Sequence, residues 1–332
     1  MNTNFKALVV EETSDGTFQR SVRQWPIKKL PDHEVLINVK YSSLNYKDAL
    51  SASGNKGVTK QYPHIPGIDA AGVVTESRDE RFQEGDEVIV TSYDLGQNTP
   101  GGFGQFIRVP SDWIVPLPNK INLQESMLFG TAGLTAAIGI YQLQYHNIEP
   151  EDGPIVVSGA TGGVGTMAVS ILTTLGYEVV AVTGKKDQKT FLQDIGARAI
   201  IPREEVQDQS SKPLLSARWS GAIDTVGGVM LDTIIRQTQP HGVVSCCGNI
   251  AGHELHTNVY PFILRGVTLS GIDSGNCAMS LRKKLWNKLA SSWKPKSLEK
   301  ISRICSLDEL NKEIDTILEG KQVGRVIVSL EN

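Results

Sequence analysis

The first third of the chain is a series of short alternations between apolar and polar residues, separated by turn residues. Examples are EVLINVKY (Glu34 to Tyr41), GVV (Gly72 to Val74) and EGDEVIV (Glu84 to Val90). A period of two is typical of strands that bury one face. The pattern over residues 1 to about 120 therefore predicts a compact, β-rich and barrel-like domain.

From about residue 123, helical patterns alternate with strands that are apolar on both faces. The strand candidates are PIVVS, EVVAVT, ARAII, GAIDTV and GVVSCC. Strands that are buried on both faces and joined by helices predict a parallel, doubly wound sheet, so the fold class is α/β. The tail adds a strand candidate, GVTLSGID, two helices at about 280–292 and 308–320, and a closing strand, GRVIVSL. The first of these helices has a basic face of Arg282, Lys283, Lys284 and Lys288.

Length and charge narrow the class of partner. A chain of 332 residues suggests two domains of about 150 residues each. The 33 basic and 36 acidic side chains nearly balance, so we expect neither nucleic acid nor an anionic membrane as partner, and a small molecule fits better. The N-terminal stretch MNTNFKALVVEETSDG lacks the features of a signal or transit peptide, and no apolar run suggests a membrane span. We therefore expect a cytoplasmic protein, with its four cysteines reduced.

A glycine-rich turn stands between the first apolar strand and its helix, in VVSGATGGVGTMAV (Val156 to Val169). Glycines at this point allow a tight turn, close approach to a pyrophosphate and close packing of helix on strand. The alternative is a merely tight turn, since Ala160 replaces the first glycine of the usual pattern. We predict a dinucleotide-binding turn made of Gly159, Ala160, Thr161, Gly162, Gly163, Val164 and Gly165.

The end of the next strand bears on the choice of dinucleotide. Sites that prefer NAD usually carry an acidic residue there, which binds the ribose 2′-hydroxyl. Here the strand ends with Thr183, Gly184, Lys185 and Lys186, and ammonium groups suit a 2′-phosphate. The pattern favours NADP(H), while Asp187 nearby leaves NAD(H) open. The alternative for the lysines is a solvated helix start.

Several segments taken together resemble the medium-chain dehydrogenase/reductase superfamily. They are SSLNYKDAL, PGIDAAGVV, EGDEVIV, GGFGQFIRVP, GTAGLTAA, GATGGVG and GAIDTVGG. Within it, SLNYKD, PGIDAAG, DTVGG and YPFILRGVTLSGIDS are similar to the zinc-independent quinone-oxidoreductase branch and to its acrylyl-CoA reductase subgroup. The resemblance implies a GroES-like catalytic domain (1–122, completed by 275–332) and a Rossmann domain (123–274).

The positions of the zinc ligands in this superfamily are occupied by other residues. Zinc alcohol dehydrogenases place a cysteine where this chain has Asn45 or Tyr46, and a His-Glu pair where it has Ile68 and Asp69. We therefore expect no bound metal. Without zinc to stabilise developing charge, oxidation of a plain alcohol is not expected. An activated C=C bond or a quinone can delocalise that charge itself, so the expected substrate is a small electrophile.

The resemblance also implies site residues. Tyr46 would lie beside the nicotinamide, where its phenol can bind a carbonyl or protonate an enolate; the alternative is a tyrosine packed at a strand end. Asn45 would orient a substrate carbonyl or cap the following turn, and Asp48 would be a helix cap. Further implied cofactor contacts are Thr131, Thr135, Arg203, Asn249, Ile263 and Ser274.

Some of these assignments have structural alternatives. Thr131 and Thr135 lie in a small-residue helix, which also allows close packing. Asn249 departs from an apolar residue in the subgroup, and Arg203 either binds the adenosine ribose or phosphate or is a surface arginine.

Three functions follow from these patterns together with the resemblance. The first is NADPH-dependent hydride transfer to the C=C bond of an α,β-unsaturated carbonyl or acyl-CoA thioester. The second is reduction of quinones with the same cofactor. The third is a sensor or structural protein that binds NADPH without turnover, since a fold does not guarantee activity. The resemblance implies that the apolar strand GVTLSGID pairs edge to edge across a two-fold axis, as in related proteins, so we expect a homodimer.

Overall fold

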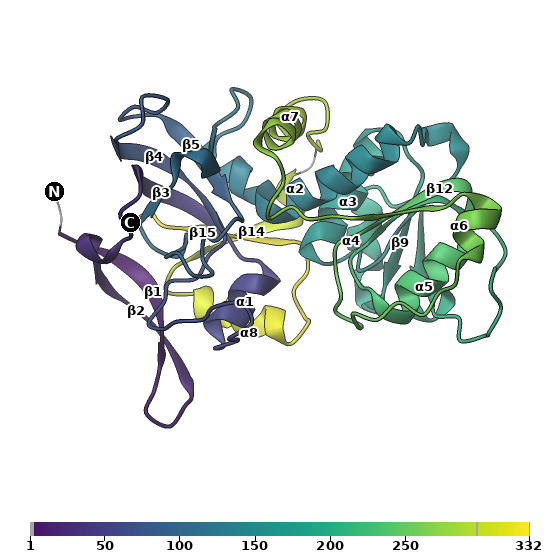
Figure 1. The fold of residues 1–332 in the computed structure, drawn as a ribbon, viewed down its shortest axis with the longest axis horizontal. Coiled ribbons are helices and arrows are strands. Elements are labelled where there is room, and N and C mark those ends of the chain that lie inside the picture. Colours follow the sequence, from purple (N-terminus) through teal and green to yellow (C-terminus); the bar gives the residue numbers. More distant parts are fainter. Residues whose placement is uncertain (1–2, 297, 332) are drawn as a thin grey trace. The chain divides into compact units, whose positions relative to one another are not determined.

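The computed structural model describes residues 3–296 and 298–331, which divide into two compact units (Figure 1). The β-rich unit comprises the described residues up to 131, with 275–290 and those from 302 onward. The parallel-sheet unit comprises 132–274 and the described part of 291–301. The described residues between 291 and 301 thus belong to the parallel-sheet unit, although the sequence-based limits assign them to the other domain.

The β-rich unit contains a mixed sheet and a separate antiparallel pair, β1 and β2. The sheet has the order β14-β15-β3-β4-β5-β7, with β6 also paired to β3. Its neighbours are antiparallel except β14 and β15. The strands are β1 Asn4–Glu12, β2 Phe18–Pro26, β3 Val35–Ser43, β4 Asp69–Ser77, β5 Glu87–Thr91, β6 Phe106–Val109, β7 Ile114–Pro116, β14 Ser302–Ser306 and β15 Arg325–Ser329.

The register of this sheet gathers polar residues at the end of β3. Strand β15 places Ile327 opposite Ser43, the last residue of β3, so Arg325 two residues earlier extends past that end. Strand β4 pairs with β3 from the other side and begins at Asp69. Side chains from three neighbouring strands therefore meet there.

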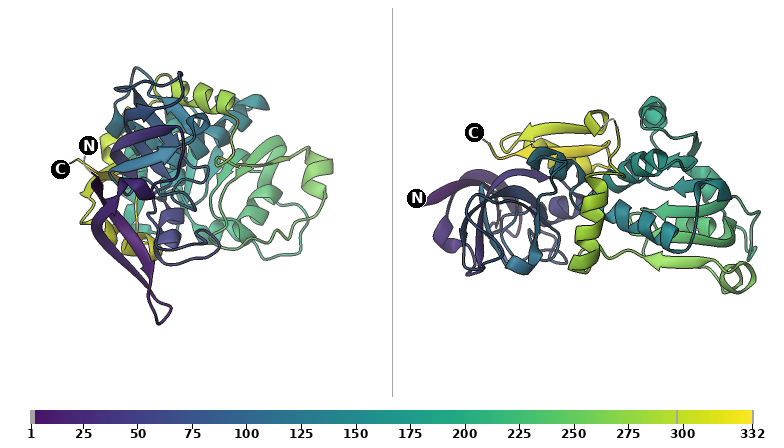
Figure 2. Two further views of the ribbon diagram at one scale, coloured as in Figure 1. Left: turned by 60° about the vertical axis from the view of Figure 1, so that its left-hand side comes forward. Right: turned by 90° about the horizontal axis from the view of Figure 1, so that it is seen from above.

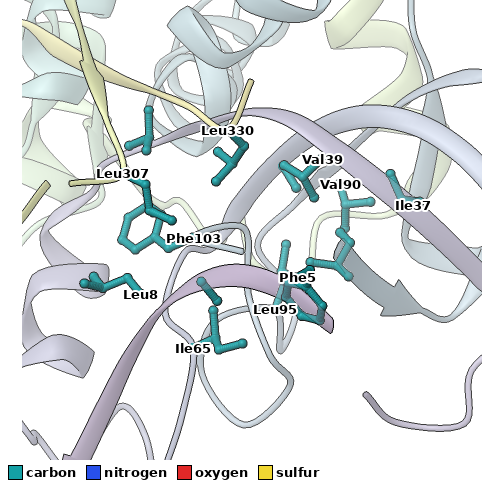
Figure 3. Close-up of a cluster of buried hydrophobic side chains, with 14 of the residues drawn as sticks. Phe5, Leu8, Ile37, Val39, Ile65, Val90, Leu95, Phe103, Leu307 and Leu330 are labelled. Carbon is teal, nitrogen blue, oxygen red and sulfur yellow. The ribbon is translucent and has the colours of Figure 1, made fainter. Parts of the chain in front are cut away.

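An apolar core fixes these strands in place. Figure 3 shows part of it, with Phe5, Leu8, Ile65, Phe103 and Leu307 among the labelled side chains. Each of these side chains is almost fully buried. Helix α1 (Tyr46–Ala52) packs against α8 (Leu310–Leu318), so the C-terminal part of the chain completes this unit.

The parallel-sheet unit has the strand order β10-β9-β8-β11-β12-β13, all parallel, as predicted (Figure 2, teal to green). The chain proceeds outward in one direction from β8 and in the other from β11. Right-handed crossovers in opposite directions put helices on both faces, which is the doubly wound arrangement. The elements are β8 Ile155–Val157, α3 Gly163–Thr174, β9 Val179–Thr183, α4 Lys189–Asp194, β10 Ala199–Pro202, β11 Trp219–Asp224, α5 Gly228–Gln237, β12 Thr238–Cys246, α6 Tyr260–Arg265 and β13 Thr268–Gly271.

Two further helices depart from the sequence-based picture. Helix α2 (Leu123–Tyr145) is long and apolar enough to cross a membrane, but 83% of its 18-residue apolar window is buried inside the protein, as in a core helix. Helix α7 (Met279–Leu289) exposes Lys283 and Lys284 as predicted. The prediction that Arg282 belongs to the same basic face is wrong, because its side chain is fully buried.

Short 3-10 helices occupy several connections. They are Ile27–Lys29, Ser111–Trp113, Pro150–Asp152, Lys186–Gln188, Arg203–Val206 and Leu298–Ile301.

Candidate active site

The turn between β8 and α3 has the close backbone packing of a dinucleotide-binding turn. Gly159 has a φ of 59°, a conformation that glycine adopts readily. A Cβ on Gly165 would overlap the carbonyl oxygen of Gly159, so the helix approaches the turn as only glycine allows. Helix α3 begins at Gly163, and the N–H groups of a helix's first turn lack acceptors within the helix. Such groups, with the helix dipole, bind phosphate.

The glycine turn lies at the point where the strand order reverses. Ser158 Oγ donates to Asp224 Oδ1 at the end of β11 (2.7 Å), and Thr225 Oγ1 donates to the carbonyl oxygen of Ser158 (2.9 Å). Burial raises the pKa of Asp224. In doubly wound sheets, ligands bind outside the carboxyl ends of the strands at this point. The residues present therefore fit a dinucleotide whose pyrophosphate rests on the glycine turn.

Two cationic side chains stand at the end of β9. A Cβ on Gly184 would overlap the guanidinium of Arg203, so that guanidinium lies directly against the Gly184 backbone. The N–H of Lys185 donates to the hydroxyl of Thr183 (3.0 Å), and burial lowers the pKa of the Lys185 ammonium. The structure thus brings together four of the predicted cofactor residues, Thr183, Gly184, Lys185 and Arg203. The positive charges of Lys185 and Arg203 fit a phosphate ester.

The other predicted cofactor contacts are more dispersed. Thr135 Oγ1 donates to Ser274 Oγ (2.7 Å), so these two are neighbours. Asn249 is exposed, and its Cα lies 3.0 Å from where Gly227 would carry a Cβ, at the start of α5. Ile263 on α6 is 67% exposed. It is two residues before Arg265, which donates to the carbonyl of Thr238 at the start of β12, the opposite end of the sheet from the glycine turn.

In the β-rich unit, polar side chains converge on Asp69. This residue is fully buried and accepts hydrogen bonds from Ser43 Oγ (2.6 Å), Asn45 Nδ2 (2.7 Å), the Thr131 N–H (2.9 Å) and Thr131 Oγ1 (2.6 Å). These donors surround the carboxylate. Asp69 therefore anchors Asn45 and Thr131.

A break in helix α2 makes this arrangement possible. Gly130 has φ 49° and ψ −152°, which are not helical, so the Thr131 N–H turns toward Asp69. A Cβ on Gly130 would lie 2.5 Å from both Asp69 Oδ2 and Ser43 Oγ, closer than side chains approach. The small-residue helix in GTAGLTAA is thus present from Thr131 onward, and the break is at Gly130, the first residue of the stretch.

A buried guanidinium completes the cluster. Arg325 is 1% exposed and donates to Ser43 Oγ (2.8 Å), to Asn45 Oδ1 (3.2 Å) and to main-chain carbonyls. Its Nη2 lies 3.9 Å from Asp69 Oδ2. Burial lowers the pKa of Arg325, and the Asp69 charge opposes that effect. A buried charge requires such compensation because its desolvation is costly.

Asp48 caps helix α1, as predicted. Its Oδ2 accepts from the Asn45 N–H (2.8 Å), and its Oδ1 accepts from the Ile68 N–H (2.8 Å). Burial and the nearby Asp69 charge raise the pKa of Asp48 to about 7. The side-chain amide of Asn45 is directed into the cluster, toward Asp69, which favours its structural role over the orientation of a substrate carbonyl.

Tyr46 differs from its neighbours in being accessible. It is the first residue of α1 and is 42% exposed. Within the described ranges, its hydroxyl has no hydrogen-bond partner in the protein. The phenol can therefore donate to a bound molecule, whereas the side-chain N–H groups of Asn45 and the hydroxyl of Thr131 already donate within the protein.

Ser43, Asp69 and Arg325 were not predicted as site residues. Arg325 had a usable signal, since it opens an otherwise apolar closing strand, and a buried charge in such a strand needs a partner. Across the parts of the chain that the structure describes, no three His, Cys, Asp or Glu side chains are grouped to hold a metal ion. Among the described residues, none of the four cysteines forms a disulfide.

Known proteins share this architecture over the whole chain. Residues 31–119 match the alcohol dehydrogenase GroES-like domain, and residues 163–291 match the zinc-binding dehydrogenase family. The "Putative quinone oxidoreductase YhfP" of Bacillus subtilis is 45% identical, over 99% of this chain and 100% of its own. Acrylyl-CoA reductase AcuI of Ruegeria pomeroyi is 40% identical, over 98% and 99%.

A solved structure of a close relative agrees with the fold. The yhdH oxidoreductase of Salmonella enterica in complex with NADP has a TM-score of 0.95 and 39% identity, over 98% of this chain and 100% of its own. The chain therefore belongs to the medium-chain dehydrogenase/reductase superfamily, with its GroES-like and Rossmann domains, as the sequence motifs indicated. Within that superfamily of oxidoreductases, its relatives include the proteins named "Putative quinone oxidoreductase YhfP" and "Acrylyl-CoA reductase AcuI".

Proposed function

We propose that this protein reduces the activated C=C bond of an α,β-unsaturated acyl-CoA thioester such as acrylyl-CoA, with NADPH as the hydride donor. The relationship to AcuI supports the substrate, and the NADP in the Salmonella relative supports the cofactor. The observation in this chain that carries the proposal is the accessible phenol of Tyr46, beside a cluster whose other polar groups bind one another.

The chain's residues have distinct tasks in this reaction. The glycine turn would hold the pyrophosphate of the cofactor. The positive charges of Lys185 and Arg203 would compensate the negative charge of its ribose 2′-phosphate. When bound, the reduced nicotinamide would supply the hydride for the β-carbon of the substrate. Tyr46 then donates its phenolic proton to the α-carbon of the resulting enolate, and water returns a proton to the phenolate. The two hydrogens saturate the C=C bond.

Tyr46→Phe tests this assignment. Removal of one general acid typically costs at least about a hundredfold in rate, so we expect kcat with acrylyl-CoA to fall by about that factor. The KM for NADPH should change much less than kcat, because the residues proposed to hold the NADPH phosphates lie on other elements and Tyr46 is expected only beside the nicotinamide. Tyr145→Phe, at another exposed tyrosine, is the matched control and should leave kcat unchanged. Equal turnover in the Tyr46→Phe variant and the wild type would remove Tyr46 from the mechanism.

Quinone reduction is the second candidate, favoured by the relationship to YhfP. It would use the same cofactor and a less selective substrate site. Rates of NADPH oxidation with acrylyl-CoA and with a simple quinone separate the two functions. A higher kcat/KM for the quinone would replace the acyl-CoA proposal.

The cofactor preference depends on the cations at the end of β9. The solved structure of YhfP holds NAD, while that of the Salmonella relative holds NADP, so both cofactors occur among relatives. Arg203→Ala removes one charge-assisted contact, so we expect the KM for NADPH to rise about tenfold and that for NADH to change little. Arg198→Ala, an exposed arginine before β10, is the control. An equal rise for both cofactors would contradict phosphate recognition by Arg203.

We also propose a cytoplasmic homodimer that pairs through β13. This strand is at the edge of the sheet, and α6 beside it exposes Tyr260, Ile263 and Leu264. An open edge with apolar neighbours suits pairing with a second copy across a two-fold axis. Ile263→Asp should convert the dimer to a monomer in sedimentation analysis; a wild-type monomer would overturn the proposal.

The proposed cytoplasmic location has its own test. Recovery of the protein in the membrane fraction of lysed cells would contradict that location.

A further inference from the structure

The turn that follows β5 has an unusual backbone. Ser92 has a φ of 64° and Tyr93 a φ of 50°, so two consecutive residues other than glycine occupy the left-handed region. Bulky side chains are rare there. Such conformations persist only where the surroundings impose them, and they concentrate at functional sites.

Several contacts hold this turn in its strained form. The Ser92 N–H donates to the carbonyl of Ile68 (2.7 Å). The Tyr93 ring stacks on Trp113, with centroids 5.4 Å apart and planes 6° apart, and the guanidinium of Arg282 lies 4.4 Å from the Tyr93 centroid. Arg282 in turn donates to the carbonyl and the hydroxyl of Thr91. The buried side chain of Arg282 thus holds the turn in place through Tyr93 and Thr91. The predicted basic face had left this burial out.

The strained turn delivers a hydroxyl to the Asp69 cluster. Ser92 Oγ lies 2.8 Å from Thr131 Oγ1, and Thr131 Oγ1 donates its proton to Asp69 (2.6 Å). Thr131 has one hydroxyl proton, so Ser92 must be the donor of the first of these hydrogen bonds. Asp69 binds Asn45 on its other side, and Asn45 directly precedes Tyr46.

We infer that Ser92 is a positioning residue for the proposed reaction. Its hydroxyl fixes the side chain of Thr131 on Asp69, and Asp69 through Asn45 fixes the start of α1, which carries Tyr46. Ser92 is only 4% exposed, so it acts through these neighbours and does not touch the substrate. This inference rests on the proposed role of Tyr46.

Two variants separate positioning from stability. Ser92→Ala and Ser92→Gly both remove the hydroxyl, but only glycine relieves the strained φ, so the glycine variant should be the more stable of the two. Loss of the hydrogen bond from Ser92 to Thr131 should lower the single-turnover rate of NADPH oxidation by acrylyl-CoA about tenfold in both variants. The KM for NADPH should change much less than this rate, because the residues proposed to hold the NADPH phosphates lie on other elements. A wild-type rate in the glycine variant would show that Ser92 matters only for stability and would overturn the inference.

Two further measurements complete the test. In the protein without ligands, the Thr131 amide, which donates to Asp69, should exchange its hydrogen faster in both Ser92 variants. In the Tyr46→Phe background, Ser92→Ala should cause no further loss of rate, because the two residues act in series. Losses that multiply in the double variant would overturn the inference and leave the role of Tyr46 intact. A wild-type rate in Tyr46→Phe alone would overturn that role and, with it, the inference.

Discussion

Gly130→Ala is expected to lower the free energy of unfolding of the β-rich unit by at least about 3 kcal/mol. Two causes add. The backbone at Gly130 (φ 49°, ψ −152°) is strained for any residue with a Cβ. The new Cβ would also lie 2.5 Å from Asp69 Oδ2 and from Ser43 Oγ, so the buried carboxylate must move away from its donors. Urea denaturation of the wild type and the variant measures the loss.

A second glycine provides the matched control. Gly320 also has a positive φ, of 68°, but nothing lies within 4 Å of where its Cβ would be. Gly320→Ala therefore reports the backbone term alone, about 1 kcal/mol. If Gly130→Ala costs no more than Gly320→Ala, the contact between Gly130 and the Asp69 cluster is not what fixes that position.

Arg325→Met is expected to cost about 3 to 5 kcal/mol, as when one partner of a buried charge pair is removed. Methionine has a similar length but no donors. The carbonyls and side-chain oxygens that Arg325 now binds would lose a partner, and Asp69 and Asp48 would lose the nearby positive charge. Urea denaturation at pH 8 measures this loss. Arg325→Lys should recover part of it, because lysine restores the positive charge but not the full set of guanidinium hydrogen bonds.

The loss of folding stability in Arg325→Met should be larger at high pH than at low pH. The folded-state pKa of Asp48 is already raised from 3.8 to about 7, so between these values the folded protein binds more protons than the unfolded chain. The contribution of Asp48 to stability is therefore fully present at low pH and declines as the pH rises toward 7. Removal of Arg325 raises the pKa of Asp48 further, because the charged carboxylate loses a nearby positive charge. At pH 5 Asp48 is already protonated and loses no such attraction, so Arg325→Met should lower the free energy of unfolding less at pH 5 than at pH 8. Asp48→Asn added to Arg325→Met should reduce the difference, and an equal cost at both pH values would contradict this account.

Local patterns were sufficient to predict the strand, the glycine turn and the helix of the proposed dinucleotide-binding segment. The strand from Ile155, the glycines from Gly159 to Gly165 and the helix from Gly163 follow one another directly in the chain, so period and turn chemistry define them. The parallel sheet followed from the repetition of this unit. The same reasoning placed Asp48 at a helix start.

The Asp69 cluster was not predictable in this way. Its members come from β3, β4, α2 and β15, and they meet only through the pairing register of neighbouring strands. Nothing local marks Gly130 as a break in α2, since its conformation is set by Asp69 and Ser43, which are distant in the chain.

Arg282 shows a different kind of failure. It lies three and seven residues before Leu285 and Leu289, so the helical period itself places it on the buried stripe. We assigned it to the exposed face because of its charge, and the acceptors on β5 that allow its burial are remote in sequence.

The central claim is that this protein transfers hydride from NADPH to the β-carbon of an unsaturated thioester. The most direct test uses NADPH deuterated at both C4 positions, with acrylyl-CoA in ordinary water, and mass spectrometry or NMR of the product. We expect propionyl-CoA with one deuterium at the β-carbon, a solvent-derived hydrogen at the α-carbon, and a slower rate with the deuterated cofactor. Acrylyl-CoA left unreduced, or a product without deuterium at the β-carbon, would contradict the account.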